Sequence, residues 1–269
     1  FLTYKGRRRT VELAFFGGNF LGLTPEDISR LLSFVRPYID TGAVDGIRFS
    51  TRPDTVTPDT LDLICDYPVS AVELGVQSMD DRVLFLSGRG HTGKDTKTAL
   101  YLIRERGIRT GVQVMIGLPG DDESTLLEST RAVAQLRPEF ARIYPLLVLK
   151  DSPLEKNYRN GKYNPLILED SVSLAAQAVR IFEAHQVRVI RVGLQASDGL
   201  DDPSVVLAGP WHPAFGHLVF SRILYDRACL AIDECLDRQG RDPEGGDGAG
   251  HLVLSVNPRS ESRLRGDKQ

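Results

Sequence analysis

The chain has 269 residues, a length that fits one large α/β domain or two small ones with a substantial core. Its 41% hydrophobic and 26% charged residues are typical of a globular protein and exclude a chain that is disordered as a whole. The 33 Lys and Arg against 36 Asp and Glu give a net charge of −3, so no overall positive field indicates a nucleic-acid or membrane partner.

The cysteines and the apolar segments indicate a cytoplasmic protein. Cys65, Cys229 and Cys235 are too few for a disulfide framework, and no signal-peptide pattern opens the sequence. The longest apolar run, near residues 144–149, is far shorter than the roughly 20 residues that a membrane-spanning helix needs. We therefore predict a cytoplasmic location and no membrane partner.

Strand and helix patterns alternate along the first 150 residues. Apolar, β-rich runs occupy residues 11–16, 46–49, 71–76, 112–116 and 141–149, and stretches with helical spacing separate them. Thr24 and Thr57 each precede a proline and an acidic residue, a pattern that predicts the start of a helix. Strands joined by such helices form a parallel sheet, so we expect an α/β barrel or an open doubly wound sheet.

The second part of the chain is less regular. Residues 151–165 are rich in turn formers, residues 169–185 have helical spacing, and residues 187–194 are typical of a strand. An aromatic loop over residues 209–217 precedes a helix over residues 218–235. The polar, glycine-rich residues 238–250 predict a flexible linker, and residues 251–256 a short strand after it.

Each of the first five strand runs ends in a cluster of glycine or polar residues. These clusters follow one another at intervals of about one β/α unit, and their markers are Gly18, Ser50, Ser78, Gly117 and Pro145. Parallel strands present their carboxyl ends at one rim, where ligands bind. An open sheet uses one or two such ends for its crevice, so five clusters favour a barrel-like site.

Three of these clusters carry candidate ligand contacts. Gly17 and Gly18 let a ligand approach the main chain, although a tight strand-to-helix turn is the more frequent explanation of such a pair. Arg52, beside two hydroxyl residues, could hold a carboxylate or a ribose, or form a surface salt bridge. Gln77 has apolar neighbours and needs a hydrogen-bond partner from a ligand or the backbone, because an unpaired polar group costs about 1–3 kcal/mol.

Residues 88–94 have the glycine and lysine spacing of a phosphate-binding P-loop, but their surroundings argue against one. Asp95 stands where the motif needs a hydroxyl, and its carboxylate would repel phosphate. The preceding residues 80–86 predict a helix, whereas a P-loop follows a strand. Arg89 and His91 on this turn could instead reach an anionic substrate, or lie in a solvated connection.

The remaining histidines and cysteines do not form a metal-ligand pattern. His212 and His217 are five residues apart and lack acidic or cysteine companions, which favours packed loop histidines. Cys229 and Cys235 lie about 240° apart around a helix, so they cannot hold one ion. We assign no metal ligand and no catalytic acid, base or nucleophile within residues 1–269.

Several motifs, in order, resemble one protein family. They are ELAFFGGNFLGL, IRFSTRPDTVTPDTLDLI, VELGVQSMDDRVL, RGHT and VMIGLPGDDE, followed by ARIYPLLVLKDSPLEKNYRNGKY, VIRVGLQASD and AGPWHPAFGHLV. Over residues 11–219 the chain resembles the radical S-adenosylmethionine (SAM) superfamily. The motifs are similar to the branch of the Elongator catalytic subunit and its short bacterial relatives without an acetyltransferase domain.

The resemblance implies a partial TIM-type (β/α)6 barrel that holds S-adenosylmethionine and a [4Fe–4S] cluster, which generate a 5′-deoxyadenosyl radical. Gly17, Gly18 and Asn19 match the motif whose backbone meets the methionyl amino group, with Asn19 in place of the more frequent acidic, Ser or Thr residue. Ser50 and Arg52 match the strand end that faces the ribose and the carboxylate. Gln77, Ile116 and Gly117 match the adenosine pocket, and the substrate would meet Arg89, His91, Tyr144 and His212.

One departure from the family is large, since its three cluster cysteines, spaced CxxxCxxC, are absent. Their place falls before Phe1, so we expect a fragment that lacks the first barrel strand and does not form the radical on its own. Residues 1–150 would be the barrel core and residues 151–237 a small C-terminal α/β extension. Residues 238–250 would be the linker, and residues 251–269 the start of a basic C-terminal segment that is cut short.

The resemblance implies an enzyme that acts on tRNA, with a flavodoxin or a ferredoxin as electron donor. Two alternatives stay open at this point. One is a radical enzyme that acts on a small molecule, as oxygen-independent coproporphyrinogen oxidases do. The other is a binding module without a cluster, which holds RNA or a nucleotide on the same rim of the barrel.

Overall fold

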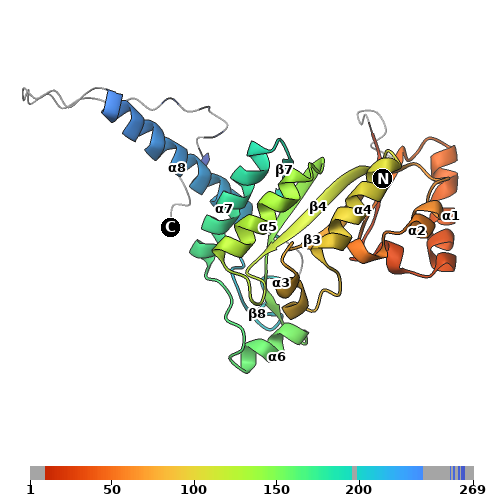
Figure 1. Cartoon of the computed structure of the whole chain (residues 1–269), viewed down its shortest axis with the longest axis horizontal. Coiled ribbons are helices and arrows are strands. Elements are labelled where there is room, and N and C mark those ends of the chain that lie inside the picture. The colour runs from red at the N-terminus through yellow and green to blue at the C-terminus, as the bar shows by residue number, and fades with distance from the viewer. Residues whose placement is uncertain are drawn as a thin grey trace, which may run out of the picture.

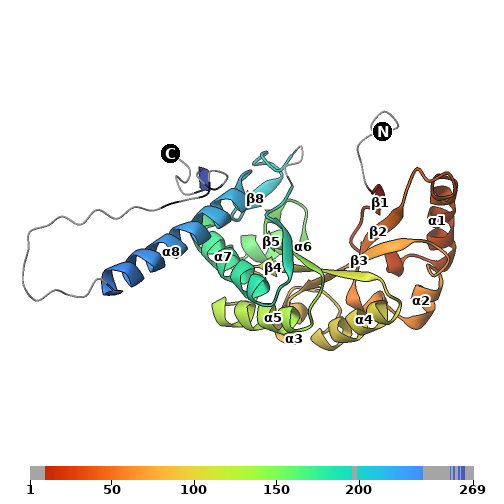
Figure 2. The same ribbon diagram turned by 90° about the horizontal axis from the view of Figure 1, so that it is seen from above.

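The computed structural model describes residues 10–195 and 199–238, together with residues 255, 257, 260, 262 and 263. Within them, six parallel strands form one curved sheet in the order β1-β2-β3-β4-β5-β7. The strands are β1 (Glu12–Phe15), β2 (Gly46–Thr51), β3 (Val69–Gln77), β4 (Arg109–Ile116), β5 (Phe140–Pro145) and β7 (Arg188–Val192). The expected partial barrel is confirmed as a half-barrel that is open on one side (Figure 2).

Helices line the convex face of this sheet, as Figures 1 and 2 show. They are α1 (Pro25–Asp40), α2 (Pro58–Asp62), α3 (Asp81–Leu86), α4 (Gly93–Glu105), α5 (Glu123–Gln135) and α7 (Leu168–Ala184). Two short 3-10 helices, η2 (Phe20–Gly22) and η3 (Pro53–Thr55), follow β1 and β2. Each helix returns the chain to the start of the next parallel strand, so all strand ends of one kind lie on one rim.

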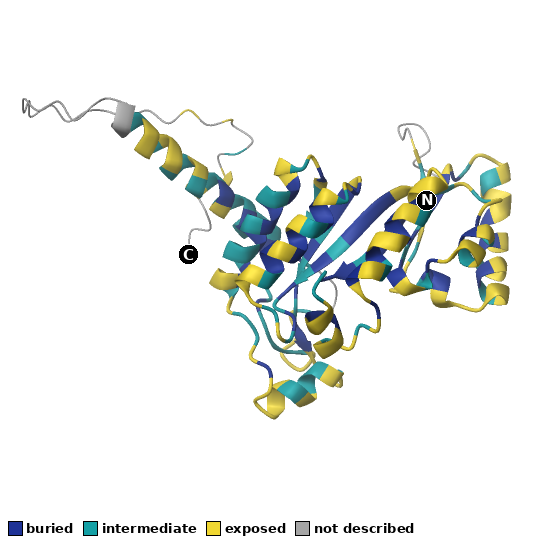
Figure 3. Ribbon diagram, viewed as in Figure 1, coloured by how far each residue is buried: buried dark blue, intermediate teal, exposed yellow. Residues whose placement is uncertain are grey.

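The core fills the space between these helices and the sheet. Ile47, Leu74, Val112 and Ile143 of four neighbouring strands and Phe182 of α7 are all fully buried there. Figure 3 shows the buried strands behind helices whose outer faces are exposed. The hydrophobic effect therefore fixes the convex face of the sheet and leaves the concave face without an apolar cover.

Short-range hydrogen bonds start the helices where the sequence predicts. The side chain of Thr24 accepts a hydrogen bond from the N–H of Asp27, and Thr57 forms a capping box with Thr60. A second capping box joins Thr92 and Asp95 at the start of α4, where Asp95 Oδ2 accepts the backbone N–H of Thr92 at 2.7 Å. These bonds hold the pKa of Asp95 below its usual range. The Asp95 carboxylate thus caps a helix that follows α3, in agreement with the exclusion of a P-loop.

The prediction of a single strand over residues 141–149 is wrong, because the structure divides this run into two strands. Strand β5 ends at Pro145, which has no N–H for the ladder, and the chain turns away from the sheet. Strand β6 (Val148–Leu149) then pairs antiparallel with β8 (Val206–Ala208) in a separate two-stranded sheet. Helix α6 (Pro153–Arg159) follows β6 over the turn-rich passage.

The elements after residue 165 complete the half-barrel. The predicted helix over residues 169–185 and strand over residues 187–194 are confirmed as α7 and β7. Because β7 pairs with β5, the main sheet continues across the expected division at residue 150. Helix α8 (Phe215–Arg238) begins earlier than expected, and after Ile223 it has no buried residue up to residue 235 (Figure 3).

The rest of the C-terminal predictions cannot be compared in the same way. Residues 239–250 of the predicted linker, and all but residue 255 of the predicted strand over 251–256, lie outside the described residues. Among the helices that the structure describes, none is long and apolar enough to cross a membrane.

Ion pairs tie the strands together on the concave face. The Glu73 carboxylate of β3 is buried between Arg48 of β2 and Arg142 of β5, whose Nε lies 2.8 Å from Glu73 Oε2. Glu12 of β1 pairs with Arg109 of β4 at 2.8 Å. Charges that are removed from water need such partners, so these pairs make a charged concave face compatible with folding.

Replacing Glu73 by glutamine leaves two partly buried guanidinium groups without their carboxylate. We expect Glu73→Gln to lower the free energy of unfolding by about 3 kcal/mol, the scale for removing one partner of a buried ion pair. The matched control Glu183→Gln removes an exposed ion pair with Arg227 and should cost at most about 1 kcal/mol. Urea denaturation measures both changes, and equal losses in the two variants would contradict the role given to Glu73.

Candidate functional site

Two adjoining cavities lie against the concave face and the carboxyl ends of its strands. The first has a volume of about 850 Å³, extends down the strands, and is lined by Gly17 and Phe16 after β1 and by the charged residues named above. The second has a volume of about 390 Å³ and lies at the rim. Gly18, Ser50, Gln113 and Tyr144 line both cavities.

In the turn after β1, main-chain atoms without a side chain over them face these cavities. Gly17 has a φ angle of +134°, which L-residues rarely adopt, whereas Gly18 has no such restriction. A Cβ atom placed on either glycine would meet no protein atom within 4 Å. The main chain of Gly18 is therefore open to a ligand in either cavity.

Asn19, the third residue of this predicted motif, has a side chain that faces the protein. Its Oδ1 accepts hydrogen bonds from Thr51 Oγ1 at 3.0 Å, Thr55 Oγ1 at 2.9 Å and the backbone N–H of Arg52 at 3.2 Å. These bonds join the turn after β1 to the end of β2. The side chain of Asn19 thus holds the glycine turn in position, while its backbone stays available for the predicted contact.

Loss of the Asn19 amide oxygen would leave three donors without this acceptor. We expect Asn19→Ala to lower the free energy of unfolding by about 1–3 kcal/mol, the usual cost of unpaired buried polar groups. Asn160→Ala, at an exposed position after α6, is the control and should change it by less than about 0.5 kcal/mol. Chemical denaturation compares the two variants, and an Asn19→Ala protein as stable as the control would remove the positioning role.

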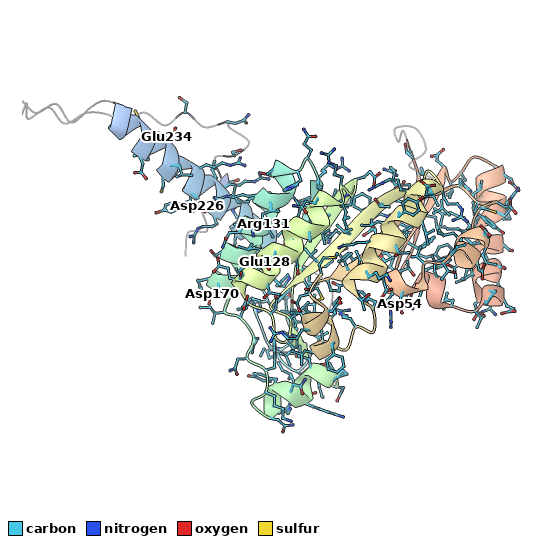
Figure 4. All side chains as sticks on the ribbon, viewed as in Figure 1. Asp54, Glu128, Arg131, Asp170, Asp226 and Glu234 are labelled. Carbon is cyan, nitrogen blue, oxygen red and sulfur yellow. The ribbon has the colours of Figure 1, made fainter. Side chains whose placement is uncertain are left out.

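The end of β2 supplies Ser50 and Arg52. The Arg52 guanidinium donates to both carboxylate oxygens of Asp54, at 2.9 Å from Nε and 2.7 Å from Nη2, which raises its pKa. Asp54 is the middle residue of η3, and Figure 4 labels it. Arg52 also approaches Gly90 so closely that a Cβ there would lie 2.9 Å from Nη2. Arg52 is therefore salt-bridged, as one sequence alternative had it, and still lines the rim cavity.

Gln77 and His91 stand together at the second cavity and are both more than nine-tenths buried. Gln77 ends β3 with a φ angle of +65°, a strained backbone for a residue other than glycine, and its Oε1 has no hydrogen-bond partner among the described residues. The Nε2 atom of His91 lies 3.1 Å from the Val76 carbonyl oxygen, so it carries the proton and donates. A ligand or a water molecule would have to satisfy the Gln77 amide.

Arg89 brings an unpaired positive charge to the same cavity. Its Nη2 lies 2.8 Å from Met115 Sδ, and the structure gives it no carboxylate partner within the described residues. Burial lowers the pKa of Arg89, and the nearby charge of Arg52 adds to this effect. Tyr144 of β5 lines both cavities, and its hydroxyl oxygen accepts a hydrogen bond from Arg142 Nη1 at 3.2 Å.

Four predicted site residues do not line either cavity, and Asn19, described above, is one of them. Ile116 is a core residue, 1% exposed, and the Gly117 carbonyl oxygen accepts a hydrogen bond from the Tyr163 hydroxyl at 2.7 Å. His212 lies at the start of α8, where its Nδ1 accepts a hydrogen bond from the N–H of Ala214 at 3.0 Å. The structure brings together Gly17, Gly18, Ser50, Arg52, Gln77, Arg89, His91 and Tyr144.

Sequence reasoning missed the charged residues lower in the half-barrel. A usable signal exists, because these residues alternate with apolar ones in strands that were interpreted as buried on both faces. The concave-face set is Glu12, Arg48, Glu73, Arg109, Gln113, Arg142 and Arg191.

The loop after β4 contains a buried carboxyl group beside this rim. Asp121 Oδ1 has no hydrogen-bond partner among the described residues, and burial raises the pKa of Asp121 to about 7. The preceding Gly120 carbonyl accepts a hydrogen bond from Arg82 Nη2 at 2.7 Å, which holds the loop against α3. Asp121 is therefore partly neutral near pH 7 in the folded protein.

This raised pKa predicts how stability depends on pH. The folded protein keeps the Asp121 proton up to about pH 7, whereas the unfolded chain loses it near pH 3.8. The contribution of this proton to the free energy of unfolding is therefore complete below pH 3.8 and is lost as the pH rises through about 7. We expect the unfolding free energy of the wild type to fall relative to Asp121→Asn between pH 5 and pH 8. Urea midpoints of both proteins at the two pH values measure this, and parallel curves would contradict it.

The residues present fit one of the two cofactors that the family resemblance implies. The joined cavities and the open glycine backbone fit a nucleoside of the size and polarity of S-adenosylmethionine. An iron–sulfur cluster needs thiolate ligands. Among the described residues no three His, Cys, Asp or Glu side chains are placed to hold a metal ion, and Cys65 lies apart from Cys229 and Cys235 on α8. The described residues therefore do not form the cluster site.

Comparison with known proteins places most of the chain in one family. Residues 2–133 match the sequence profile of the radical SAM superfamily, and residues 138–224 match that of the radical SAM C-terminal domain. A tRNA uridine(34) acetyltransferase of Dehalococcoides mccartyi is 29% identical over 205 residues, which are 68% of this chain and 44% of that protein. These matches confirm the family resemblance of the motifs.

Other similarities agree with this result. An uncharacterized protein of Methanocaldococcus jannaschii is 31% identical over 164 residues, 60% of this chain and half of that protein. The structure of Elp3 from Methanocaldococcus infernus superposes with a TM-score of 0.71 at 23% identity, over 81% of this chain and 54% of the other, which shows a shared fold. The chain spans about half the length of the curated relatives it matches.

Proposed function

We propose that this chain, which belongs to the radical SAM superfamily, binds S-adenosylmethionine in the joined cavities and forms the substrate-binding half-barrel of an enzyme that acts on tRNA. The observation that carries the cofactor part is the open backbone of Gly18 at the wall shared by both cavities. When bound, S-adenosylmethionine supplies the radical chemistry by which this superfamily removes a hydrogen atom from a substrate.

The residues of this chain bind and orient the cofactor in this proposal. The backbone around Gly17 and Gly18 meets its amino group, as the motif resemblance implies, and Ser50 and Arg52 meet its ribose and carboxylate. The Gln77 Oε1, which has no partner among the described residues, accepts a hydrogen bond from the adenosine. Ile116 and Gly117 match positions of the adenosine pocket in the motif resemblance, and neither lines the two cavities.

The substrate side of the proposal rests on Arg89, His91 and Tyr144. Arg89 is an unpaired guanidinium among the described residues, and such a group favours an anionic partner. His91 Nε2 is engaged with the Val76 carbonyl, which fixes the ring beside the cavity. His212 stays a predicted substrate contact that lies away from the two cavities.

The tRNA part of the proposal comes from the relatives. The similar protein of Dehalococcoides mccartyi is named a tRNA uridine(34) acetyltransferase, and its similarity extends over 68% of this chain. We propose that a flavodoxin or a ferredoxin supplies electrons. A small-molecule substrate and a binding module without a cluster are the alternatives that the substrate assay and the iron analysis below distinguish.

Gly18→Val tests the cofactor site. A Cβ atom at this position meets no protein atom within 4 Å, so we expect the variant to fold, but the side chain would occupy the space that the cofactor needs. We expect at least a tenfold weaker affinity for S-adenosylmethionine, measured by equilibrium dialysis, and a smaller loss for Gly18→Ala. Unaltered thermal denaturation is the control for folding, and an unchanged affinity of a folded Gly18→Val protein would overturn the site.

The native gene product, purified without oxygen, tests the cluster and the tRNA substrate of this proposal. We expect about four irons per chain, which is one cubane cluster, and conversion of tRNA in preference to small molecules such as coproporphyrinogen. A protein without iron would favour the binding module.

A further inference from the structure

The concave face of the half-barrel carries more positive than negative charge. Four guanidinium groups but only two carboxylates line the first cavity. The arginines are Arg48, Arg109, Arg142 and Arg191, and the carboxylates belong to Glu12 and Glu73. At neutral pH this cavity therefore holds a surplus of two positive charges.

Ion pairs account for three of the four arginines. Arg48 and Arg142 share Glu73, and Arg109 pairs with Glu12 at 2.8 Å. Both carboxylates are thereby neutralised toward any ligand. Arg191, on β7, is half-buried and has no acidic or hydrogen-bonding side-chain partner within residues 10–195 and 199–238.

The register of the sheet places Arg191 directly opposite Arg142. The two residues are Cα partners in the ladder between β5 and β7, and Gln113 of β4 is the Cα partner of Arg142 on the other side. Like charges at directly opposed positions destabilise a sheet, and Glu73, which Arg142 shares with Arg48, is the protein anion beside this pair, whereas Arg191 has none of its own among the described residues. At these opposed positions β4, β5 and β7 carry Gln113, Arg142 and Arg191. The polar groups of these three side chains are hydrogen-bond donors, apart from the Gln113 amide oxygen.

This arrangement is suited to an anion with several acceptor oxygens. Guanidinium groups bind phosphate in bidentate geometry, and the surplus of two positive charges matches the charge of a phosphate monoester. Tyr144 follows Arg142 by two residues on β5 and lines both this cavity and the rim cavity. An anion bound here would therefore be attached to a ligand that also reaches the rim.

We propose that Arg191 and Arg142, with Gln113, form a subsite that binds a phosphate group of the substrate inside the half-barrel. The word substrate here rests on the proposed function, whereas the phosphate site itself does not require it. The subsite lies below the glycine turn and uses none of the residues assigned to S-adenosylmethionine.

Inorganic phosphate is the first probe, with binding followed by isothermal titration calorimetry at low ionic strength. We expect Arg191→Gln to bind phosphate at least tenfold more weakly than wild type and Arg191→Lys to lose less. Arg188→Gln is the matched control, because Arg188 lies on the same strand, is exposed and does not line the cavity. The stability of Arg191→Gln should equal or exceed that of wild type, since the repulsion with Arg142 is removed.

The outcomes separate this proposal from the proposed function. Lost phosphate affinity with retained affinity for S-adenosylmethionine supports the subsite, whereas equal phosphate affinities of Arg191→Gln and Arg188→Gln overturn it whatever the cofactor does. RNA oligonucleotides with and without a 5′-phosphate form the second arm. A preference for the phosphorylated end indicates a terminal phosphate, and equal, Arg191-dependent binding of both indicates a backbone phosphate.

Discussion

The structure depends on the fact that a half-barrel buries only one face of its sheet. Helices α1, α4, α5 and α7 cover the convex face with an apolar core, and in the part of the chain that the structure describes the concave face receives no such layer (Figures 1 and 3). A closed barrel fills its interior with apolar side chains, but here the interior meets solvent or a ligand. The strands therefore carry charged residues at the positions that face inward, and Glu73 forms ion pairs with two of the arginines.

This single constraint gives the site two levels. At the rim, Gly17 and Gly18 after β1 leave the backbone accessible, and Asn19 holds this turn against the end of β2. Below the rim, long charged side chains span neighbouring strands. Because Gly18 and Tyr144 belong to both levels, a ligand bound at one level has a direct path to the other.

The family match and the geometry supply different parts of the functional argument. The match to the radical SAM superfamily indicates which cofactor chemistry to expect, while the geometry shows which residues of this chain are free to meet it. Asn19 illustrates the difference, since its place in the motif suggests a ligand contact and its amide oxygen is engaged with β2. For Asn19 the motif therefore indicates the position of the backbone, but not the direction of the side chain.

The sequence by itself determined the alternation of strands and helices, the helix starts at Thr24 and Thr57, and the shared rim of five strand ends. These features follow from local signals, namely apolar periodicity, capping residues and the fixed direction of parallel strands. Only the tertiary structure decided that the run after Phe140 breaks at Pro145, and that Arg142 and Arg191 stand side by side. Strand register joins residues almost fifty positions apart, and no pattern within one segment contains that information.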